Sequence, residues 1–283
     1  MIRNLLVVGG GTMGRGIAQT AAAAGCEVRL FDIQPRLAAA APGEIESALR
    51  RAAEKGKFDT ARIPETLARI RVSDRLADPA PCDLAIEAIV ENLAAKRQLF
   101  RELEEALPAA AILASNTSSL RIADVTRDLH RPERALGLHF FNPVPAMPLV
   151  EIIRGPATGE AVLADAREWV ARLGKTPVIA ADTPGFIVNR LLIPYLNDAA
   201  QAFQEGLASA EDIDTAMKLG AGHPLGPLAL ADLIGLDIVV DILETRAQAS
   251  GNPRDLPCAL LKDLVAQGRL GRKTGWGFHR YSR

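Results

Sequence analysis

The sequence predicts an α/β protein in which a Rossmann-like domain built on a parallel sheet is followed by an all-helical domain. Two observations carry this prediction. In the first half of the chain, short apolar runs alternate with longer segments of helical periodicity, which is typical of β-α-β units. After residue 183 the strand-like runs stop, and helical patterns continue nearly to the end. We therefore expect a first domain over residues 1–183 and a second over residues 184–283.

The expected elements follow from periodicity and from turn residues along the chain. Strands are expected over residues 4–9, 27–32, 83–88, 111–116, 135–141, 148–155 and 176–182. Helices are expected between them, over residues 12–25, 35–57, 93–107 and 159–173. This alternation predicts a parallel sheet with helices on both faces. At the boundary between the two domains, Thr183 is a candidate N-cap with Pro184 at the first helical position.

Composition and charge exclude several classes of partner. A formal net charge of −1 is not expected for a protein that binds nucleic acid or an anionic membrane surface. With only 2 Trp and 2 Tyr, stacking on single-stranded nucleic acid is not expected either. We expect no membrane span, because no apolar stretch is long enough. Cys26, Cys82 and Cys258 have no metal or redox spacing, which favours a reduced, cytoplasmic location and no metal site.

A glycine-rich turn joins the first expected strand to the first helix. The segment VVGGGTMGRG places three glycines where a dinucleotide-binding turn needs them, for the tight turn, the approach to a pyrophosphate and the packing of helix on strand. The N-terminus of the following helix offers N–H groups and a favourable dipole to phosphates. A glycine turn without a ligand is the alternative. The residues expected at the dinucleotide are Gly9, Gly11, Thr12, Met13 and Gly14.

Asp32 indicates which dinucleotide this turn receives. It lies 18 residues after Gly14, at the end of the second expected strand, where a carboxylate accepts the ribose hydroxyls of NAD. The same carboxylate would repel the 2′-phosphate of NADP, although Arg36 nearby keeps NADP open. NAD is therefore the expected cofactor.

Two ionisable residues interrupt apolar strands. His139 lies in GLHFFNPVP, and Glu151 lies in LVEII. Each can be a satisfied core residue, because buried polar groups need partners. Together they favour a pair in which the carboxylate fixes the imidazole tautomer for proton transfer. In that case Phe140 and Phe141 exclude water from the ring, and the prolines stiffen the loop.

Polar residues also follow an apolar strand in ASNTSSL, residues 114–120. Loops at the carboxyl ends of parallel strands bind ligands, so Asn116 and Ser118 are candidate site residues. The alternative is a helix cap, in which Ser118 or Ser119 precedes LRIADV. Asn189, early in the helix after Thr183, either faces the domain junction or makes an ordinary surface or interdomain hydrogen bond.

Six ordered motifs make essentially the whole chain resemble one enzyme family. They are VVGGGTMGRGIAQ, SNTSSL, GLHFFNPVPAMPLVEII, DTPGFIVNRLL, DIDTAMKLGAGHPLGPLAL and GRKTGWGF. The family is that of the 3-hydroxyacyl-CoA dehydrogenases, and its bacterial 3-hydroxybutyryl-CoA members look most similar. The resemblance implies NAD-dependent oxidation of the (S)-3-hydroxyl of an acyl-CoA to a ketone, or the reverse reduction. It also implies a helical domain that forms a homodimer, with the acyl-CoA in a cleft between the domains.

The resemblance also implies roles for single residues. His139 would be the catalytic base and Glu151 its partner, with Ser118 and Asn189 contacting the substrate. Lys55 would contact CoA, whereas the family's CoA-binding serine falls on Ala48, next to Ser47. The cofactor residues beyond the glycine turn would be Asp32, Glu91, Lys96, Asn116, Ser118, Asn142 and Lys273.

Two other functions are compatible with a dinucleotide-binding fold. A dehydrogenase of a free 3-hydroxy acid would commonly use a lysine instead of a His–Glu pair, and the spacing of HFFNP and VEI argues against it. A sensor or structural protein that binds the dinucleotide without turnover is the second. It would have no need of a complete set of site residues, namely Ser118, His139, Glu151 and Asn189.

Overall fold

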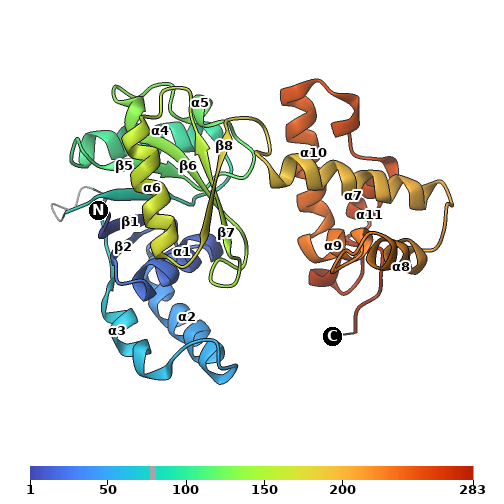
Figure 1. Ribbon diagram of the computed structural model, residues 1–283, viewed down its shortest axis with the longest axis horizontal. Helices are drawn as coiled ribbons and strands as arrows, with labels where there is room; N and C mark the ends of the chain where they lie inside the picture. Colours follow the sequence, from blue (N-terminus) through green and yellow to red (C-terminus); the bar gives the residue numbers. More distant parts are fainter. Residues whose placement is uncertain (77–80, 283) are drawn as a thin grey trace. The chain divides into compact units, whose positions relative to one another are not determined.

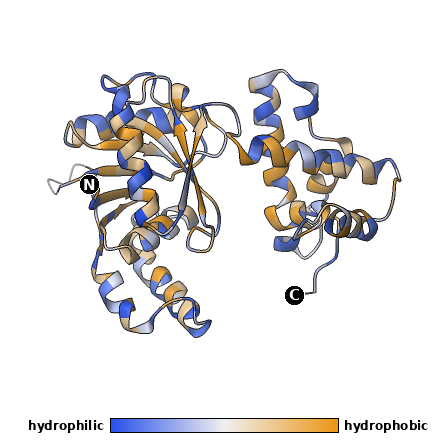
Figure 2. Cartoon of the chain, viewed as in Figure 1, coloured by the Kyte–Doolittle hydropathy of each residue, from blue (hydrophilic) through white to orange (hydrophobic). Residues whose placement is uncertain are grey.

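The computed structural model describes residues 1–76 and 81–282, which form two compact units. The first unit comprises Met1–Thr183 and the second Pro184–Arg283 (Figure 1). Strands occur only in the first unit among the described residues, and the second is helical. Hydrophobic residues concentrate along the strands and on the inner helix faces of each unit (Figure 2). Each unit therefore has a core of its own.

An eight-stranded sheet forms the centre of the first unit, in the order β3-β2-β1-β4-β5-β6-β7-β8. All neighbouring strands pair in parallel except β6 and β7. The predicted Rossmann-like domain is therefore confirmed, with a sheet that is mostly parallel instead of parallel throughout. The short strand β3 was not predicted. The strands are β1 (Asn4–Val8), β2 (Glu27–Phe31), β3 (Ile70–Val72), β4 (Leu84–Glu87), β5 (Ile112–Ser115), β6 (Ala135–Phe140), β7 (Leu149–Arg154) and β8 (Thr176–Ala181).

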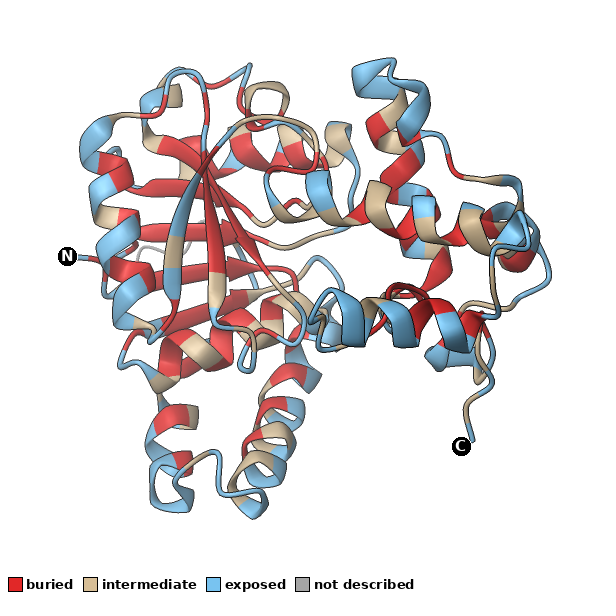
Figure 3. Cartoon of the chain, turned by 45° about the vertical axis from the view of Figure 1, so that its right-hand side comes forward, coloured by how far each residue is buried: buried red, intermediate tan, exposed pale blue. Residues whose placement is uncertain are grey.

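Helices cover both faces of this sheet. Leu5 and Val7 of β1 pack in a cluster with residues of α1, α2 and α6, whereas the alternate residues Leu6 and Val8 pack with α4 and α5. Figure 3 shows most of the strands as a buried layer beneath helices whose outer sides are exposed, whereas the edge strand β8 is largely exposed. The helices are α1 (Thr12–Ala23), α2 (Pro35–Glu54), α3 (Ile63–Ala68), α4 (Leu93–Ala106), α5 (Ile122–Val125) and α6 (Glu160–Arg172), with 3-10 turns at Thr60–Arg62 and Pro132–Arg134.

The direction of β7 differs from the all-parallel arrangement that the sequence predicted. β6 and β7 are antiparallel, and the segment between them, residues 141–148, contains no helix. A parallel connection needs about a dozen residues or more, usually with a helix, so this segment can only turn the chain back. The register of the pair places His139 directly opposite Glu151. The antiparallel turn is therefore what brings these two residues together.

Residues 184–282 of the second unit form five α-helices around a core that includes Leu196, Leu228, Leu236 and Leu243. The all-helical character predicted for this part of the chain is confirmed. The helices are α7 (Val188–Gln204), α8 (Ala210–Gly220), α9 (Pro227–Ile234), α10 (Leu236–Ser250) and α11 (Ala259–Ala266), with 3-10 turns at Pro253–Asp255 and Arg272–Thr274.

The first helix of this unit starts later than the sequence predicted. The N-cap of α7 is Ile187 instead of Thr183. Gly185 has φ 79° and Phe186 has φ 50°, which is left-handed backbone that a right-handed helix does not contain. A turn over residues 184–187 therefore precedes the helix, and Asn189 is the second residue of α7.

Candidate active site

The predicted glycine turn lies between β1 and α1. Gly9 has φ 116°, and a Cβ on it would stand 2.4 Å from the carbonyl oxygen of Ala88. A Cβ on Gly14 would stand 1.7 Å from the carbonyl oxygen of Gly9. A Cβ on Gly11, in contrast, would meet nothing within 4 Å. The packing thus requires glycine at two positions, and the open space at Gly11 fits the approach of a dinucleotide phosphate.

Asp32 lies at the edge of the same turn, directly after β2. Its Oδ2 accepts a hydrogen bond from the backbone N–H of Gly10 at 2.7 Å, and its Oδ1 accepts one from Gln34 N at 2.7 Å. The half-buried carboxylate is therefore fixed beside the glycines, where it fits the ribose of NAD. Thr12 and Met13 form the start of α1, with Thr12 exposed and Met13 packed on the core.

Two alanine substitutions separate the packing role of the glycines from ligand binding. Gly14→Ala should destabilise the protein by about 1–3 kcal/mol, because the new methyl group overlaps the turn. Gly11→Ala should leave the unfolding midpoint nearly unchanged, since it meets no protein atom, yet raise KM for NAD. Thermal unfolding and steady-state kinetics measure both effects. Wild-type KM in Gly11→Ala would contradict a phosphate site at this position.

His139 and Glu151 face each other across β6 and β7. His139 Nδ1 lies 2.7 Å from Glu151 Oε2, and the two residues are 5% and 0% exposed. In an antiparallel pair, residues directly opposite each other place their side chains on the same face of the sheet. A carboxylate on Nδ1 holds the imidazole in one orientation. The arrangement is that of a histidine prepared for proton transfer through its other nitrogen.

Only one of the two phenylalanines contacts this histidine as expected. The rings of His139 and Phe141 lie 4.5 Å apart and are tilted by 53°. Phe140, the residue between them, packs edge-on against Trp169 at 6.4 Å in the core. Because side chains alternate along a strand, Phe140 points to the opposite face of the sheet, and the expectation that it shields the ring is wrong.

The loop after β5 carries two further candidate residues. The Asn116 side-chain oxygen accepts a hydrogen bond from Phe140 N at 2.9 Å, which ties the loop to the end of β6. Ser118 lies at the outer end of the loop, and its backbone N–H donates to Glu91 Oε1 at 3.0 Å. The alternative that a serine caps the next helix is wrong, because the Asp182 carboxylate accepts the N–H groups at the start of α5.

Glu91 is the acceptor that organises this loop. Its Oε1 accepts from Thr117 Oγ1 at 2.5 Å and from both the backbone N–H and the hydroxyl of Ser119. Its Oε2 lies 3.1 Å from Lys96 Nζ. Burial alone would raise the pKa of Glu91, but the Lys96 charge and the hydrogen bonds outweigh it and hold the pKa below its ordinary value. Glu91 is therefore ionised in the neutral pH range.

Lys96 is more deeply buried than its predicted role implies. It is only 1% exposed, and its ammonium lies 2.5 Å from Glu87 Oε1 as well as 3.1 Å from Glu91. The structure thus places Lys96 between two carboxylates. Its direct contact with a cofactor stays a prediction.

Asn142 and Ala48 share a groove of about 300 Å³. Its wall is formed by α1, α2 and the loop after β6, including Thr12, Arg15, Glu44, Ala48, Arg51 and Asn142. Lys55 is exposed at the C-terminal end of α2. A cavity of about 690 Å³ bounded in part by α1 and α3 has basic residues in its wall, namely Lys57, Arg62, Arg69 and Arg172.

Two predicted site residues belong to the second unit. Asn189 is half-buried in the first turn of α7. Lys273 lies in the 3-10 turn near the end of the chain, and its Nζ contacts both Asp237 oxygens at 2.5 and 2.6 Å. Their roles toward substrate and cofactor stay predictions.

Models of both domains of one enzyme family match the chain. The 3-hydroxyacyl-CoA dehydrogenase NAD-binding domain matches residues 4–183, and the C-terminal domain of the same family matches residues 185–281. The chain belongs to the 3-hydroxyacyl-CoA dehydrogenase family. It is accordingly an NAD-dependent oxidoreductase, and NAD is its cofactor.

Similarity to members of this family extends over nearly the whole chain. The probable 3-hydroxybutyryl-CoA dehydrogenase of Bacillus subtilis is 46% identical over 99% of this chain and 98% of its own length. The human mitochondrial hydroxyacyl-coenzyme A dehydrogenase is 44% identical over 99% of this chain and 92% of its own. The crystal structure of (S)-3-hydroxybutyryl-CoA dehydrogenase PaaH1 from Ralstonia eutropha superposes with a TM-score of 0.95, at 42% identity and with 100% of both chains covered.

One buried acid of the site was missed in the sequence. Glu87 is 0% exposed at the end of β4, and its signal was the same as that of Glu151, an acid inside the apolar run DLAIEA. No helix in the described ranges is long and apolar enough to cross a bilayer.

Proposed function

We propose that this chain oxidises the 3-hydroxyl of a short-chain (S)-3-hydroxyacyl-CoA, such as 3-hydroxybutyryl-CoA, to the 3-ketoacyl-CoA, or carries out the reverse reduction. The names of the relatives from Bacillus subtilis and Ralstonia eutropha support the short-chain substrate. The observation that carries the proposal is the 2.7 Å contact between His139 and Glu151, in a unit whose glycine turn fits NAD.

His139 is the proposed general base and acid. Because Glu151 engages Nδ1, Nε2 is the ring atom that would exchange a proton with the 3-hydroxyl. An ionised Glu151 would keep the Nδ1 proton in place and stabilise the positive charge that develops on the ring. The low exposure of both residues strengthens that attraction, since the local dielectric constant is low. Positioned acid–base catalysis of this kind contributes about 10²–10⁴-fold to a rate.

The cofactor is held by the first unit in this proposal. Bound NAD supplies the redox chemistry of the reaction. The glycine turn would receive its pyrophosphate at the N-terminus of α1, and Asp32 would accept its ribose hydroxyls. The other residues assigned to the cofactor are Thr12, Met13, Glu91, Lys96, Asn116, Ser118, Asn142 and Lys273.

Substrate contacts are proposed for Ser118 and Asn189, which would orient the C3 oxygen and the thioester carbonyl. Lys55 would meet the phosphates of CoA, supported by its exposure at the end of α2. Lys57, Arg62 and Arg172 in the wall of the neighbouring cavity add positive charge to the same side of the unit. Arg69 in that wall is paired with Glu27 and Glu65.

The domain roles and the assembly belong to the same proposal. The first domain, 1–183, would bind NAD, and the second, 184–283, would complete the substrate site and form a homodimer. Five leucines of the second unit are more than half exposed, which supports an interface there. They are Leu191, Leu207, Leu219, Leu233 and Leu256. Free cysteines at all three positions support a cytoplasmic location.

Turnover of matched substrates tests the proposed reaction. We expect NAD-dependent oxidation of (S)-3-hydroxybutyryl-CoA, followed by NADH absorbance, with far slower oxidation of free 3-hydroxybutyrate. Equal kcat/KM for the thioester and the free acid would remove CoA from the proposal. NADH binding without any turnover of either compound would favour a non-catalytic dinucleotide-binding protein.

A further inference from the structure

Glu87 holds the two backbone segments that follow β4 and β5. Its Oε1 accepts from Ile89 N at 2.8 Å and contacts Lys96 Nζ at 2.5 Å, and its Oε2 accepts from Ser115 Oγ at 2.7 Å. Ser115 Oγ in turn accepts from Thr117 N at 3.2 Å. One carboxylate thus connects the ends of two neighbouring strands with α4.

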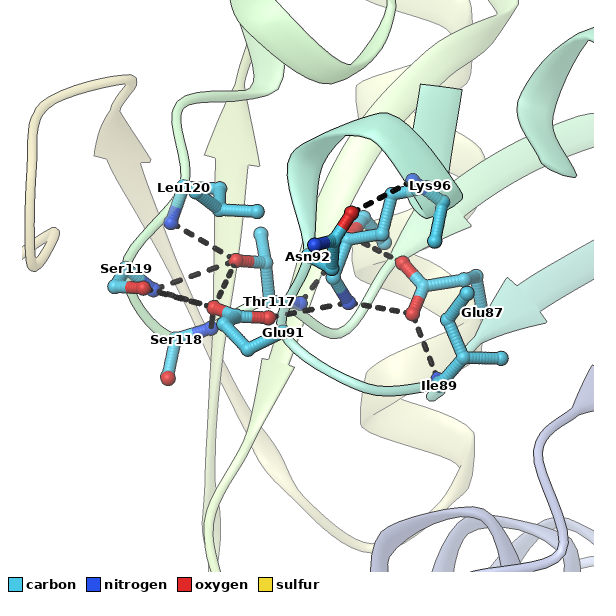
Figure 4. Close-up of polar contacts among 11 residues, drawn as sticks. Glu87, Ile89, Glu91, Asn92, Lys96, Thr117, Ser118, Ser119 and Leu120 are labelled. Carbon is cyan, nitrogen blue, oxygen red and sulfur yellow. Dashed lines mark hydrogen bonds and ion pairs between the residues drawn. The ribbon is translucent and has the colours of Figure 1, made fainter. Parts of the chain in front are cut away.

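Lys96 carries this connection onward to Glu91. The ammonium contacts Glu87 on one side and Glu91 on the other, and Glu91 receives donors from Thr117, Ser118 and Ser119. Figure 4 shows the chain of contacts from Glu87 through Lys96 to Glu91 and the loop. In the same view the Ser118 side chain points away from Glu91, on the outer side of the loop.

Fold stability alone does not explain a charged cluster at this position. Glu87 and Lys96 are 0% and 1% exposed, and buried ion pairs are often no more stabilising than apolar residues of similar size. The three residues before Glu87 in β4, Leu84 to Ile86, are buried and apolar, as a central strand favours. The acid occurs only at the strand end, where the sheet meets the ligand-binding loops.

The same carboxylate also supports the glycine turn. By accepting the N–H of Ile89, Glu87 fixes the backbone of residues 88–89. That backbone is the surface against which Gly9 packs, since a Cβ on Gly9 would stand 2.4 Å from the carbonyl oxygen of Ala88. Glu87 therefore holds in place residues that contact the proposed pyrophosphate turn, and through Lys96 and Glu91 it also holds the Ser118 loop.

We propose that Glu87 is a positioning residue for the cofactor site, acting through Lys96 and Glu91 on the Ser118 loop and through Ile89 on the glycine turn. The inference rests on the proposed function, because it takes these two segments as the walls of the cofactor site. Glu87 itself touches neither substrate nor cofactor in this proposal.

Glu87→Gln tests the proposal, because glutamine keeps the size of the side chain but removes the charged partner of Lys96. Losing a charged hydrogen bond of this kind changes an equilibrium constant by about tenfold or more. We expect KM for NAD and Kd for NADH to rise about tenfold, with a smaller fall in kcat. Amide hydrogen exchange of residues 116–120 should become faster.

Glu104→Gln is the matched control. Glu104 is another buried acid of the first unit, and it lies in the last turn of α4, at the other end of that helix from Lys96. Its carboxylate accepts the backbone N–H groups of His130 and Arg131. It should lower the unfolding midpoint by a similar amount and leave KM for NAD unchanged. A similar rise of KM in Glu104→Gln would overturn the positioning role, as would wild-type KM in folded Glu87→Gln.

Thr117→Val keeps the proposal testable if Glu87→Gln does not fold. It removes the hydroxyl that donates to Glu91 Oε1 and that accepts from the backbone N–H of Leu120 at 2.9 Å. We expect KM for NAD to rise about threefold, and normal KM in the folded variant would overturn the inference. Combined with Glu87→Gln, its effect should be less than additive, because both act on one loop. Kd for NADH and hydrogen exchange need no turnover, so they test this inference even if the proposed reaction fails.

Discussion

Replacing His139 with glutamine is expected to lower kcat by about 10²–10⁴-fold, the usual contribution of positioned acid–base catalysis. Glutamine is of similar length and places its amide near the position of Nε2, but this amide cannot take up and return a proton. The glycine turn and Asp32 are unchanged, so Kd for NADH should stay close to the wild-type value. Kinetics with 3-hydroxybutyryl-CoA and NADH fluorescence titration measure the two quantities.

His130→Gln provides a surface control for this substitution. His130 is exposed in the same unit, and the contact shown for it is its backbone N–H on Glu104, which does not involve the ring. We expect wild-type kinetics from this variant. If His139→Gln lost NADH binding and kept kcat at saturating NAD, the ring would serve the cofactor site instead of proton transfer.

The alternation of strands and helices could be predicted because each element has a strong local signal. Buried parallel strands are continuous apolar runs, and Gly9 and Gly14 mark the turn between the first strand and helix. The short strand β3 has no such signal, since two of its three residues, Arg71 and Val72, are exposed at the sheet edge. Local pattern therefore missed β3 at one edge of the sheet, although it predicted β8 at the other edge.

The direction of β7 and the start of α7 depend on backbone geometry that the pattern of apolar residues does not encode. The length of the segment over residues 141–148 did carry the information, because it is too short for a parallel crossover. At the start of α7, Thr183 and Pro184 form a plausible helix start, and the left-handed conformation of Phe186 overrides it. A positive φ at phenylalanine is rare and could not be anticipated.

The residues of the site divide in the same way. Glu151 could be found because an acid in an apolar strand demands a partner, and Glu87 carries the same signal in DLAIEA. The burial of Lys96 could not be found, because lysines on helices are ordinarily exposed. Glu87 and Glu91 precede it closely in the sequence, but only the fold shows that both carboxylates meet its ammonium. The sequence thus identifies single polar residues inside apolar segments. Which of these residues contact one another can be seen only in the folded structure.

Glu151→Gln is expected to lower kcat by about 10³-fold or more, although it preserves the size and the hydrogen-bonding capacity of the side chain. The amide N–H₂ group can donate to His139 Nδ1, which would place the ring proton on Nε2 and prevent that atom from accepting one. The amide also lacks the charge that stabilises the ring once it is protonated. Kd for NADH should change little, because Glu151 lies between β6 and β8 in the sheet, away from the glycine turn.

Combining the two substitutions decides whether Glu151 acts through the histidine. If its only catalytic contact is His139 Nδ1, the double variant His139→Gln/Glu151→Gln should be no slower than His139→Gln alone, because residues that act as a unit are not additive. Multiplied losses in kcat would show that Glu151 serves the reaction by a second route. Glu104→Gln, which neutralises a buried acid outside this pair, should retain wild-type kcat and so separate loss of mechanism from loss of stability.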